Sequence, residues 1–371
     1  MAPYFALVAL AGALALLSQA AAKTFAKVSA DDFTASTTDP RAVNRRWTFF
    51  DYVLVLVIVS FSALRYEVGT DYSTSSGLYE ALDPQYWVAQ LAASPLEIGY
   101  TAFSLALRSF SEDPHLIFWS TSVLTVIPIY ATIKKQSYDV PLAVMLYILF
   151  AFFVGPFNII RQGIAIALSF WAASFFEKNK VAFGVINGIA VLFHASALIA
   201  IIVQLVVRLW RPKPRTLVIT VIVGVAVFSQ LITLPLFIDV VTALIPRYAY
   251  YVGDDTQRSG IGAYLVAAAH AGLLLYVIFV NRTNDKSRRY IDPSWLTFVA
   301  VGVFFLVVAT FSVVAGRPAG YFTIFMLLLI PNQLATRPQA VSKSILLVSA
   351  VLYFAFYLSN YGGLVPYQTY L

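Results

Sequence analysis

Four arginines lie where apolar stretches end, at positions where a charged side chain is costly. Arg161 stands beside Gln162 in "FNIIRQGIAIALSF" (157–170), and the other three are Arg65, Arg247 and Arg317. A guanidinium stays charged at physiological pH and is expensive to bury in hydrocarbon. Its planar fork binds phosphate or carboxylate through two hydrogen bonds at once. These positions predict an anion site; the alternative is that the side chains reach the membrane surface or pair with an acidic neighbour such as Glu97.

Two further side chains are candidates for proton transfer near this site. His194, in "VLFHASAL", lies at an expected turn, where a neutral imidazole could accept a proton from a hydroxyl nucleophile. Its alternative role is that of a structural hydrogen-bond donor. Glu97 precedes the apolar stretch 98–110, where apolar surface could raise its pKa and suit it to acid–base catalysis. Alternatively, Glu97 caps the helix that follows.

Outer loops are expected to surround these groups. The loop "LRYEVGTDYSTSSGLYEALDP" (64–84) carries carboxylates and tyrosines, a combination suited to sugars, because rings stack on CH faces and carboxylates accept hydrogen bonds from hydroxyls. Loop 237–258 is expected to form an amphipathic helix and a turn, and "AGRPAGYF" (315–322) adds Arg317. Part of the tyrosine content is also expected to form an interfacial belt. The combination of arginines, carboxylates and aromatics predicts a cavity for an anionic lipid-linked head group, with a diphosphate as the leading candidate.

The composition indicates the kind of protein that positions these residues. Of 371 residues, 60% are hydrophobic and 12% are charged, whereas a soluble domain has about 25% charged residues. The absence of cysteine excludes thiolate chemistry and cysteine metal sites, and three histidines make a histidine-rich metal centre an unattractive hypothesis. The net charge of +7 reports membrane topology rather than nucleic-acid binding.

Apolar runs predict an all-α polytopic membrane protein with about 12 transmembrane helices (roughly 10–14), in a single domain over residues 1–371. Stretch 98–110 is too short to cross and is expected to be an interfacial or re-entrant helix. Stretch 181–207 is expected to enter the membrane and return, turning near His194. The first run is expected to be a retained span rather than a cleaved signal. The expected spans are 4–22, 48–64, 115–133, 140–157, 159–176, 181–193, 195–210, 216–236, 261–280, 294–314, 318–335 and 343–359.

This layout separates the basic residues by type. Every lysine falls on the cytoplasmic side, where residues 23–47 form a connector, and both termini face outward. The outer loops 65–114 and 237–260 are expected to form the site. The basic residues on the outer side are all arginines, which indicates a chemical need for the guanidinium fork: Arg65, Arg108, Arg161, Arg247, Arg258 and Arg317. Arg108 and Arg258 fit a purely structural role better than the other four.

A further indication comes from four stretches: "LRYEVGTDY" (64–72), "FNIIRQGIAIAL" (157–168), "LFHASAL" (192–198) and "GRPAGYF" (316–322). Together with "EIGY" (97–100) and "VPYQTYL" (365–371), they resemble, in order and spacing, the EpsG-type branch of Wzy-like polysaccharide polymerases. The resemblance covers nearly the whole chain, and its most specific parts are the Arg-x-x-x-Gly-Thr-Asp and Arg-Gln stretches.

The resemblance implies a GT-C-like glycosyltransferase in the plasma membrane, with short amphipathic helices at the outer face. Such an enzyme polymerises undecaprenyl-diphosphate-linked repeat units, as in O-antigen or exopolysaccharide biosynthesis. It transfers the growing glycan to the non-reducing end of an acceptor unit. No cofactor, metal or nucleic acid is implied. The implied partners are the lipid-linked glycans, membrane lipid, a Wzz-like chain-length regulator and a flippase.

The resemblance also implies roles for individual residues. The donor diphosphate is assigned to Arg161, Arg247, Arg317 and Arg65, although Arg65 could instead pair with Asp71 and shape the loop. The catalytic base is left open among His194, Glu97 and Asp71. The candidates for substrate binding are Gln162, Tyr72, Tyr248, Tyr321 and Asp254.

Three alternatives to a polymerase remain. A GT-C transferase adding one sugar, or an O-antigen-type ligase, would differ in the length of its product. A transporter of a lipid-linked anion is disfavoured because no inverted repeat is apparent. A structural subunit of an export machine would have no evident use for Arg161 and Gln162.

Overall fold

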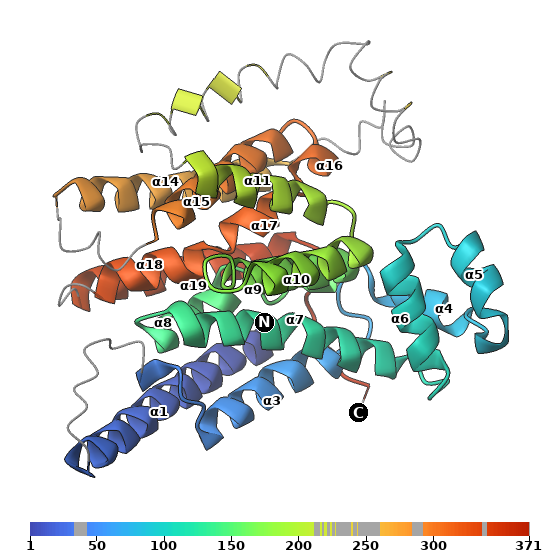
Figure 1. Cartoon of the computed structure of the whole chain (residues 1–371), viewed down its shortest axis with the longest axis horizontal. Coiled ribbons are helices and arrows are strands. Elements are labelled where there is room, and N and C mark those ends of the chain that lie inside the picture. Colours follow the sequence, from blue (N-terminus) through green and yellow to red (C-terminus); the bar gives the residue numbers. More distant parts are fainter. Residues whose placement is uncertain are drawn as a thin grey trace. The chain divides into compact units, whose positions relative to one another are not determined.

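A computed structural model describes residues 1–32, 43–210, 260–283, 292–335 and 340–370, together with isolated positions between 216 and 243. The chain divides into two compact units, Met1–Leu198 with Ile330–Leu371, and Ile199–Leu329. Both are built from helices (Figure 1). Over the described residues, extended pairing is limited to one isolated bridge between Arg65 and Thr369.

The first unit contains the elements that position most of the predicted site. Its helices are α1 (Ala2–Asp32), α3 (Phe49–Ala63), α4 (Tyr72–Glu80), α5 (Trp87–Ala93), α6 (Ile98–Arg108), α7 (His115–Gln136), α8 (Val140–Leu149), α9 (Ile160–Ala173), α10 (Lys180–Phe193) and α19 (Ala340–Asn360), with 3₁₀ turns η1 (Pro84–Tyr86) and η2 (Gly155–Phe157). Helix α1 packs on α3 and α8, α7 packs between α3 and α9, and α9 packs on α10. Helices α4, α5 and α6 form a separate group beside α7 (Figure 1).

The second unit consists of α14 (Ile261–Thr283), α15 (Pro293–Ala309), α16 (Val313–Gly316) and α17 (Ala319–Thr323). Helix α15 packs on the other three. Two glycines permit this packing: a Cβ on Gly302 would lie 2.7 Å from a Thr323 side-chain carbon, and one on Gly316 would lie 2.2 Å from Ala309. Helices α11 (Ala197–Trp210) and α18 (Met326–Ala335) run across the boundaries between the units.

The helices lie where the expected apolar segments were placed. Their length and apolar composition indicate a membrane protein. Within the described residues, four helices are long and apolar enough to cross a bilayer: Ala2–Phe25, His115–Gln136, Ile261–Phe279 and Val341–Asn360. Other expected spans coincide with apolar helices of 10–17 residues. At 1.5 Å per residue such helices are shorter than the roughly 30 Å hydrocarbon core. The expected span 216–236 lies outside the described residues.

Residues 150–159 explain why two neighbouring segments are shorter than predicted. Helix α8 ends at Leu149, and Ala151 adopts a positive φ of 63°. Pro156 then lies in η2, where its ring removes a backbone donor and restricts the preceding residue. Helix α9 begins only at Ile160. The apolar run is therefore interrupted by a turn rather than continued as helix.

Two expectations about the cytoplasmic side need correction. The connector 23–47 begins as helix, because α1 continues to Asp32 through "AAAKTFAK", which is rich in good helix formers. Lys134, expected in a loop, lies in the last turn of α7 and is buried, with Nζ 3.0 Å from Asp51 Oδ1. The Ser18 hydroxyl donates to the same carboxylate at 2.7 Å. A buried charge is tolerated here because it is paired and hydrogen-bonded.

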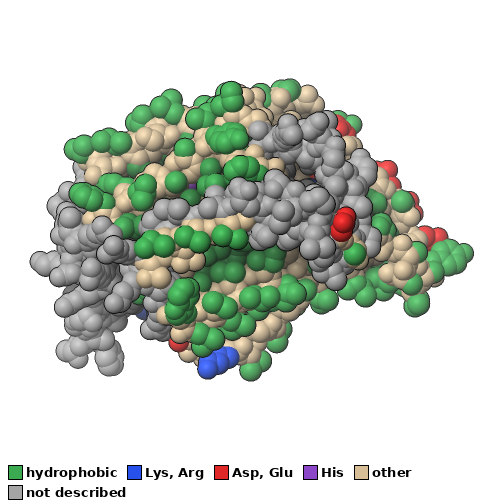
Figure 2. Space-filling view, turned by 90° about the horizontal axis from the view of Figure 1, so that it is seen from above, with side chains coloured by type: hydrophobic (Ala, Val, Ile, Leu, Met, Phe, Trp, Pro, Cys, Tyr) green, Lys and Arg blue, Asp and Glu red, His purple; other side chains and the backbone are tan. Residues whose placement is uncertain are grey.

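Many apolar side chains are exposed on the face of the molecule drawn in Figure 2. Large hydrophobic residues are exposed along α1, α3, α10, α11, α14 and α19. Extended apolar surfaces of this kind are rare on soluble monomers, and they fit the lipid-facing surface of a membrane protein.

Candidate functional site

Three segments far apart in the sequence meet at one junction: loop 64–72, turn 155–160 and segment 361–370. Gly69 has a φ of +90°, and a Cβ there would lie 2.5 Å from the carbonyl oxygen of Phe157. The Gly69 N–H donates to the Gly363 carbonyl at 3.2 Å. The Thr70 N–H donates to Asn158 Oδ1 at 2.7 Å. Glycine is required at position 69 by both its conformation and its surroundings.

Segment 361–370 lies along the first loop. The Tyr66 N–H donates to the Gln368 carbonyl at 2.9 Å, next to the bridge between Arg65 and Thr369. Gly362, at a φ of +64°, leaves room for Asn158, whose Nδ2 would lie 1.7 Å from an added Cβ. Segment 361–370 is therefore part of the junction itself.

Asp71 joins this junction to the start of α9. Its Oδ2 accepts a hydrogen bond from the Ile160 N–H at 3.1 Å. The first N–H groups of a helix lack partners within the helix and favour a negative charge. Asp71, predicted as one of three candidate bases, thus holds the turn of α9 that carries Arg161.

Arg161 lies at the centre of a charged cluster with Glu97 and His194. The Arg161 guanidinium forms an ion pair with Glu97 Oε2. His194 Nδ1 lies 2.9 Å from the other oxygen, Oε1. About a third of the Arg161 side chain is exposed (33%), whereas the Glu97 side chain is almost enclosed (9%). The predicted alternative that Arg161 pairs with Glu97 is confirmed, although the Arg161 side chain remains partly exposed.

The cluster draws on the ends of three helices. Arg161 is the second residue of α9, Glu97 immediately precedes α6, and His194 follows the last residue of α10. The turn expected near His194 is confirmed, since α11 begins at Ala197. Gly99 permits the approach of α6 to α10, because a Cβ there would lie 2.6 Å from the Leu192 carbonyl oxygen.

The environment of Glu97 overturns the expectation that its pKa is raised. Burial of the carboxyl opposes ionisation, but the contact with His194 and the charge of Arg161 outweigh it and lower the pKa of Glu97 to about 2. Glu97 occupies the N-cap position of α6, yet its side chain forms no capping hydrogen bond. The pairing of Glu97 with Arg161, 64 positions away, was one of the sequence-based alternatives, but the expected pKa considered burial alone. The contact of Glu97 with His194 was not predicted.

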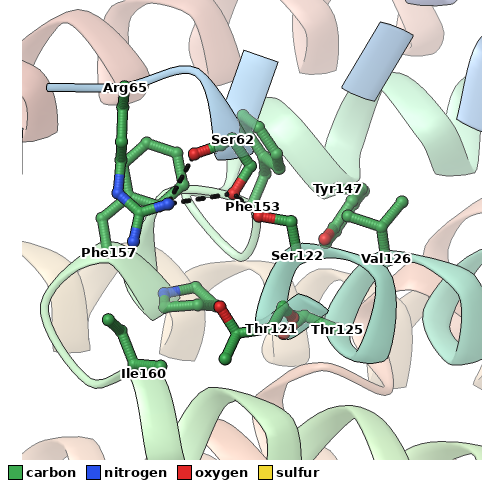
Figure 3. A pocket seen from close by; sticks show the side chains of 11 residues that line it. Ser62, Arg65, Thr121, Ser122, Thr125, Val126, Tyr147, Phe153, Phe157 and Ile160 are labelled. Atoms are coloured by element: carbon green, nitrogen blue, oxygen red, sulfur yellow. Dashed lines mark hydrogen bonds between the residues drawn. The ribbon is translucent and has the colours of Figure 1, made fainter. Parts of the chain in front are cut away.

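Arg65 lies in a different environment from Arg161 (Figure 3). It is 2% exposed, and its guanidinium lies over the rings of Phe118 (4.9 Å) and Phe157 (4.3 Å). Its Nη1 donates to the Ser62 carbonyl at 2.5 Å. The adjoining cavity, of about 10 Å³, is near the lower limit for one water molecule. A diphosphate could reach this guanidinium only if the rings moved, so Arg65 ties together α3, α7 and η2.

The remaining predicted residues fall into three groups. Tyr72 and Gln162 are buried in the first unit, and the Tyr72 ring stacks on Phe118 at 4.3 Å. Arg317 is exposed and Tyr321 is buried, and both belong to the second unit. The predicted residues that lie outside the described part of the chain are Arg247, Tyr248 and Asp254.

Sequence reasoning overlooked a second polar group at the junction. His115 Nδ1 lies 2.7 Å from Asp113 Oδ1, and Nε2 lies 3.4 Å from the Tyr72 hydroxyl. The His115 ring lies 3.6 Å from the ring of Tyr370. The only hint in the sequence was the "DPH" triplet at 113–115 before an apolar run, which is too weak to identify a contact with residue 370.

Comparison with known proteins gives one result that covers most of the chain. The model of the EpsG family matches residues 48–369. This range includes the loop, the turn and the segment that meet at the junction, as well as the charged cluster. Comparisons with curated proteins and with solved structures gave no significant match.

Proposed function

The chain belongs to the EpsG family, which indicates a function of the polysaccharide-polymerase type, and from this premise we propose a specific reaction. The chain polymerises undecaprenyl-diphosphate-linked repeat units at the outer face of the plasma membrane. It transfers the growing glycan to the non-reducing sugar of an acceptor unit. The observation that supports this proposal best is the cluster of Arg161, Glu97 and His194, in which a partly exposed arginine adjoins a carboxylate–imidazole pair.

In this reaction His194 is the catalytic base and Glu97 is a positioning residue. The contact of Nδ1 with Glu97 fixes the orientation of the imidazole and leaves Nε2 to accept the proton of the acceptor hydroxyl. A carboxylate whose pKa is about 2 is itself a poor base at neutral pH. Glu97 also stabilises the imidazolium that forms, as the carboxylate does in other carboxylate–histidine pairs.

Arg161 acts on the leaving group. The acceptor oxygen forms a bond to the anomeric carbon of the donor, the bond from that carbon to the diphosphate oxygen breaks, and its electron pair remains on the undecaprenyl diphosphate. The exposed part of the Arg161 fork stabilises this developing charge. Arg317 and Arg247 are further candidates for the diphosphate. The proposal includes a GT-C-like arrangement of about 12 spans, and a flippase and a chain-length regulator as partners.

An assay of product length tests the reaction. We would incubate the purified full chain with undecaprenyl-diphosphate-linked repeat units and a chelator and resolve the products by size. Wild type is expected to give a ladder of products. Arg161→Lys keeps the charge but loses the two-point fork, and a loss of about 100-fold in rate is expected from removing such a stabilising donor. Arg108→Lys, at another arginine on the outer side, is the matched control and should retain the ladder.

Each outcome distinguishes the proposal from an alternative. A single addition from wild type would indicate a transferase or a ligase instead. Retention of the full rate in Arg161→Lys would contradict the two-point role of this residue. His194→Ala is expected to abolish the ladder while binding of the lipid-linked unit persists. Loss of binding in this variant would instead assign His194 to substrate recognition.

A further inference from the structure

An open pocket of about 310 Å³ lies among α4, α5 and α6. This volume is at the lower end of the roughly 300–1,000 Å³ typical of small-molecule sites. The pocket is lined by residues 75–104 of the first unit, and none of its lining residues carries a charge. It therefore has no group suited to a diphosphate, in contrast to the cluster around Arg161.

One face of α6 leads from the charged cluster into this pocket. Glu97, Tyr100, Thr101 and Ser104 recur at helical spacing and lie on the same side of the helix. Glu97 contacts Arg161, whereas the other three residues line the pocket. The Arg161 charge also acts on the buried Tyr100 hydroxyl, which adjoins Ser75 and Ser104. A ligand with an anionic end at the charged cluster and a neutral end in the pocket would match this face of α6.

The lining identifies the chemistry of the neutral end. The lining combines leucine side chains such as Leu78 and Leu82 with hydroxyl and amide groups, including Ser75, Gln90 and Ser104. The Gln90 side-chain oxygen already accepts a hydrogen bond from the Asp83 N–H at 3.2 Å, whereas the buried Ser104 hydroxyl has no hydrogen-bond partner among the described residues. A prenyl chain would leave the Ser104 hydroxyl unsatisfied, which is costly. A sugar ring offers apolar CH faces and hydroxyls together, and can satisfy both kinds of lining group.

We propose that this pocket holds a neutral sugar ring of the lipid-linked glycan while its diphosphate, or that of the partner substrate, lies at Arg161. The inference rests on the proposed function, because it assumes that the same enzyme handles a diphosphate and a glycan. The ring comes from the donor unit or from the acceptor unit, and the two sources share the same recognition chemistry.

The first test measures the binding of neutral sugars to the full chain in lipid nanodiscs. The probes are the methyl glycosides of glucose, galactose and N-acetylglucosamine, followed by saturation-transfer NMR. Ala93→Trp places an indole at the mouth of the pocket and is expected to weaken binding at least about tenfold. Val88→Trp is the matched control on α5, since Val88 is 82% exposed and does not line the pocket. It should bind like wild type.

A second, more conservative variant keeps the test valid if Ala93→Trp misfolds. Ser104→Ala removes one hydroxyl without filling the pocket, and a loss of about twofold to tenfold is expected for one hydrogen bond. Unchanged glycoside binding in both Ala93→Trp and Ser104→Ala would overturn the proposal, as would a wild-type chain that binds none of the three probes.

A sugar-free lipid separates this inference from the proposed function. Farnesyl diphosphate should bind wild type and Ala93→Trp equally, because the pocket does not contact its diphosphate. Loss of farnesyl diphosphate binding in Ala93→Trp would show a prenyl pocket and overturn the inference. If wild type binds the glycosides but not farnesyl diphosphate, the proposed diphosphate chemistry fails while the sugar pocket is supported.

Kinetics then identify the source of the ring. A delipidated repeat-unit oligosaccharide can serve only as acceptor, so a raised KM for it in Ala93→Trp would place the acceptor sugar in the pocket. A raised KM for the lipid-linked donor at saturating acceptor would place the donor sugar there. Unchanged KM values for both substrates would contradict the proposal.

Discussion

At the scale of single residues, the cluster assigns different tasks to two groups that look equivalent in sequence. Glu97 and His194 are both potential bases, yet the carboxylate is held between a guanidinium and an imidazole, which lower its pKa to about 2. In the proposed reaction, the imidazole contacts that carboxylate through Nδ1 and uses its other nitrogen for the acceptor hydroxyl. Environment rather than residue type decides which of the two accepts a proton.

Because the pKa of Glu97 is lowered in the folded protein, the free energy of unfolding depends on pH. The pKa of this group falls from 4.5 to about 2 on folding, so its contribution is fully present above pH 4.5 and is lost as the pH falls towards 2. By linkage this amounts to up to about 3 kcal/mol. Thermal unfolding of wild type should therefore shift downward between pH 5 and 3.

Glu97→Gln should be less stable than wild type at pH 7 and should lack this component of the acid dependence. The measurement is the unfolding temperature of both proteins at several pH values in the same detergent. Parallel curves for the two proteins would show that the carboxylate is not ionised in the cluster.

At the scale of helices, close backbone approach at glycine decides whether the cluster can form. Gly99→Ala would force α6 away from Leu192 at the end of α10, beside His194. We expect a cost of about 1–3 kcal/mol and a loss of activity of at least about tenfold, since misplacement by about 1 Å can cost 100-fold. The measurements are the polymerisation rate and the unfolding temperature of the same preparation.

Gly184→Ala is the matched control for this prediction. Gly184 lies on α10, and nothing lies within 4 Å of a Cβ added there. Alanine in that helix should be neutral or stabilising by about 0.5–1 kcal/mol. Equal losses of activity in the two variants would show that helix propensity, rather than the contact between α6 and α10, limits the enzyme.

The helices themselves could be predicted from the sequence far better than their junctions. Long apolar runs indicate a helix because a membrane leaves few other ways to satisfy the backbone. The break between the expected spans 140–157 and 159–176 was predicted at residue 158, but α8 already ends at Leu149. The early end was missed because residues 150–157 are as apolar as a span, and only Pro156 and the conformation of Ala151 interrupt them. The pairing of Asp71 with the start of α9 was missed because it joins segments 89 positions apart.

In the candidate site, too, the residues could be predicted from the sequence, whereas their tertiary contacts could not. The arginines and His194 were identified because charge in an apolar run is conspicuous. Their environments were not predictable, since burial of Arg65 and exposure of Arg161 depend on tertiary packing. The His115 group was overlooked because Tyr72 lies 43 positions before His115 and Tyr370 lies near the C-terminus, so the contacts with both residues are non-local.

At the scale of the molecule, segment 361–370 connects several elements of the first unit at the junction with loop 64–72. The Tyr367 hydroxyl donates to the Phe61 carbonyl at 2.6 Å, and the two rings stack at 4.2 Å. The Tyr4 hydroxyl donates to the Leu364 carbonyl at 2.7 Å. The segment thus connects α1, the end of α3 and the loop before α4.

Deletion of residues 364–371 should therefore lower both stability and activity. Several hydrogen bonds at about 1 kcal/mol each are lost, and a fall of several degrees in unfolding temperature is expected. Tyr367→Phe removes one of these bonds and should show a smaller effect. Tyr52→Phe, at a tyrosine that is 62% exposed, should show none. A deletion variant with wild-type activity and stability would contradict the connecting role.

The junction between Gly69 and Gly363 also fixes when the site can exist during synthesis. The loop emerges from the ribosome about 300 residues before the segment that it binds. At the usual rate of about 5–20 residues per second, this delay is on the order of tens of seconds. Glu97, Arg161 and His194 are all inserted within that interval, beside a loop whose partner strand has yet to be made. In the proposed reaction, the junction beside the charged cluster is therefore incomplete until segment 361–370 has been made.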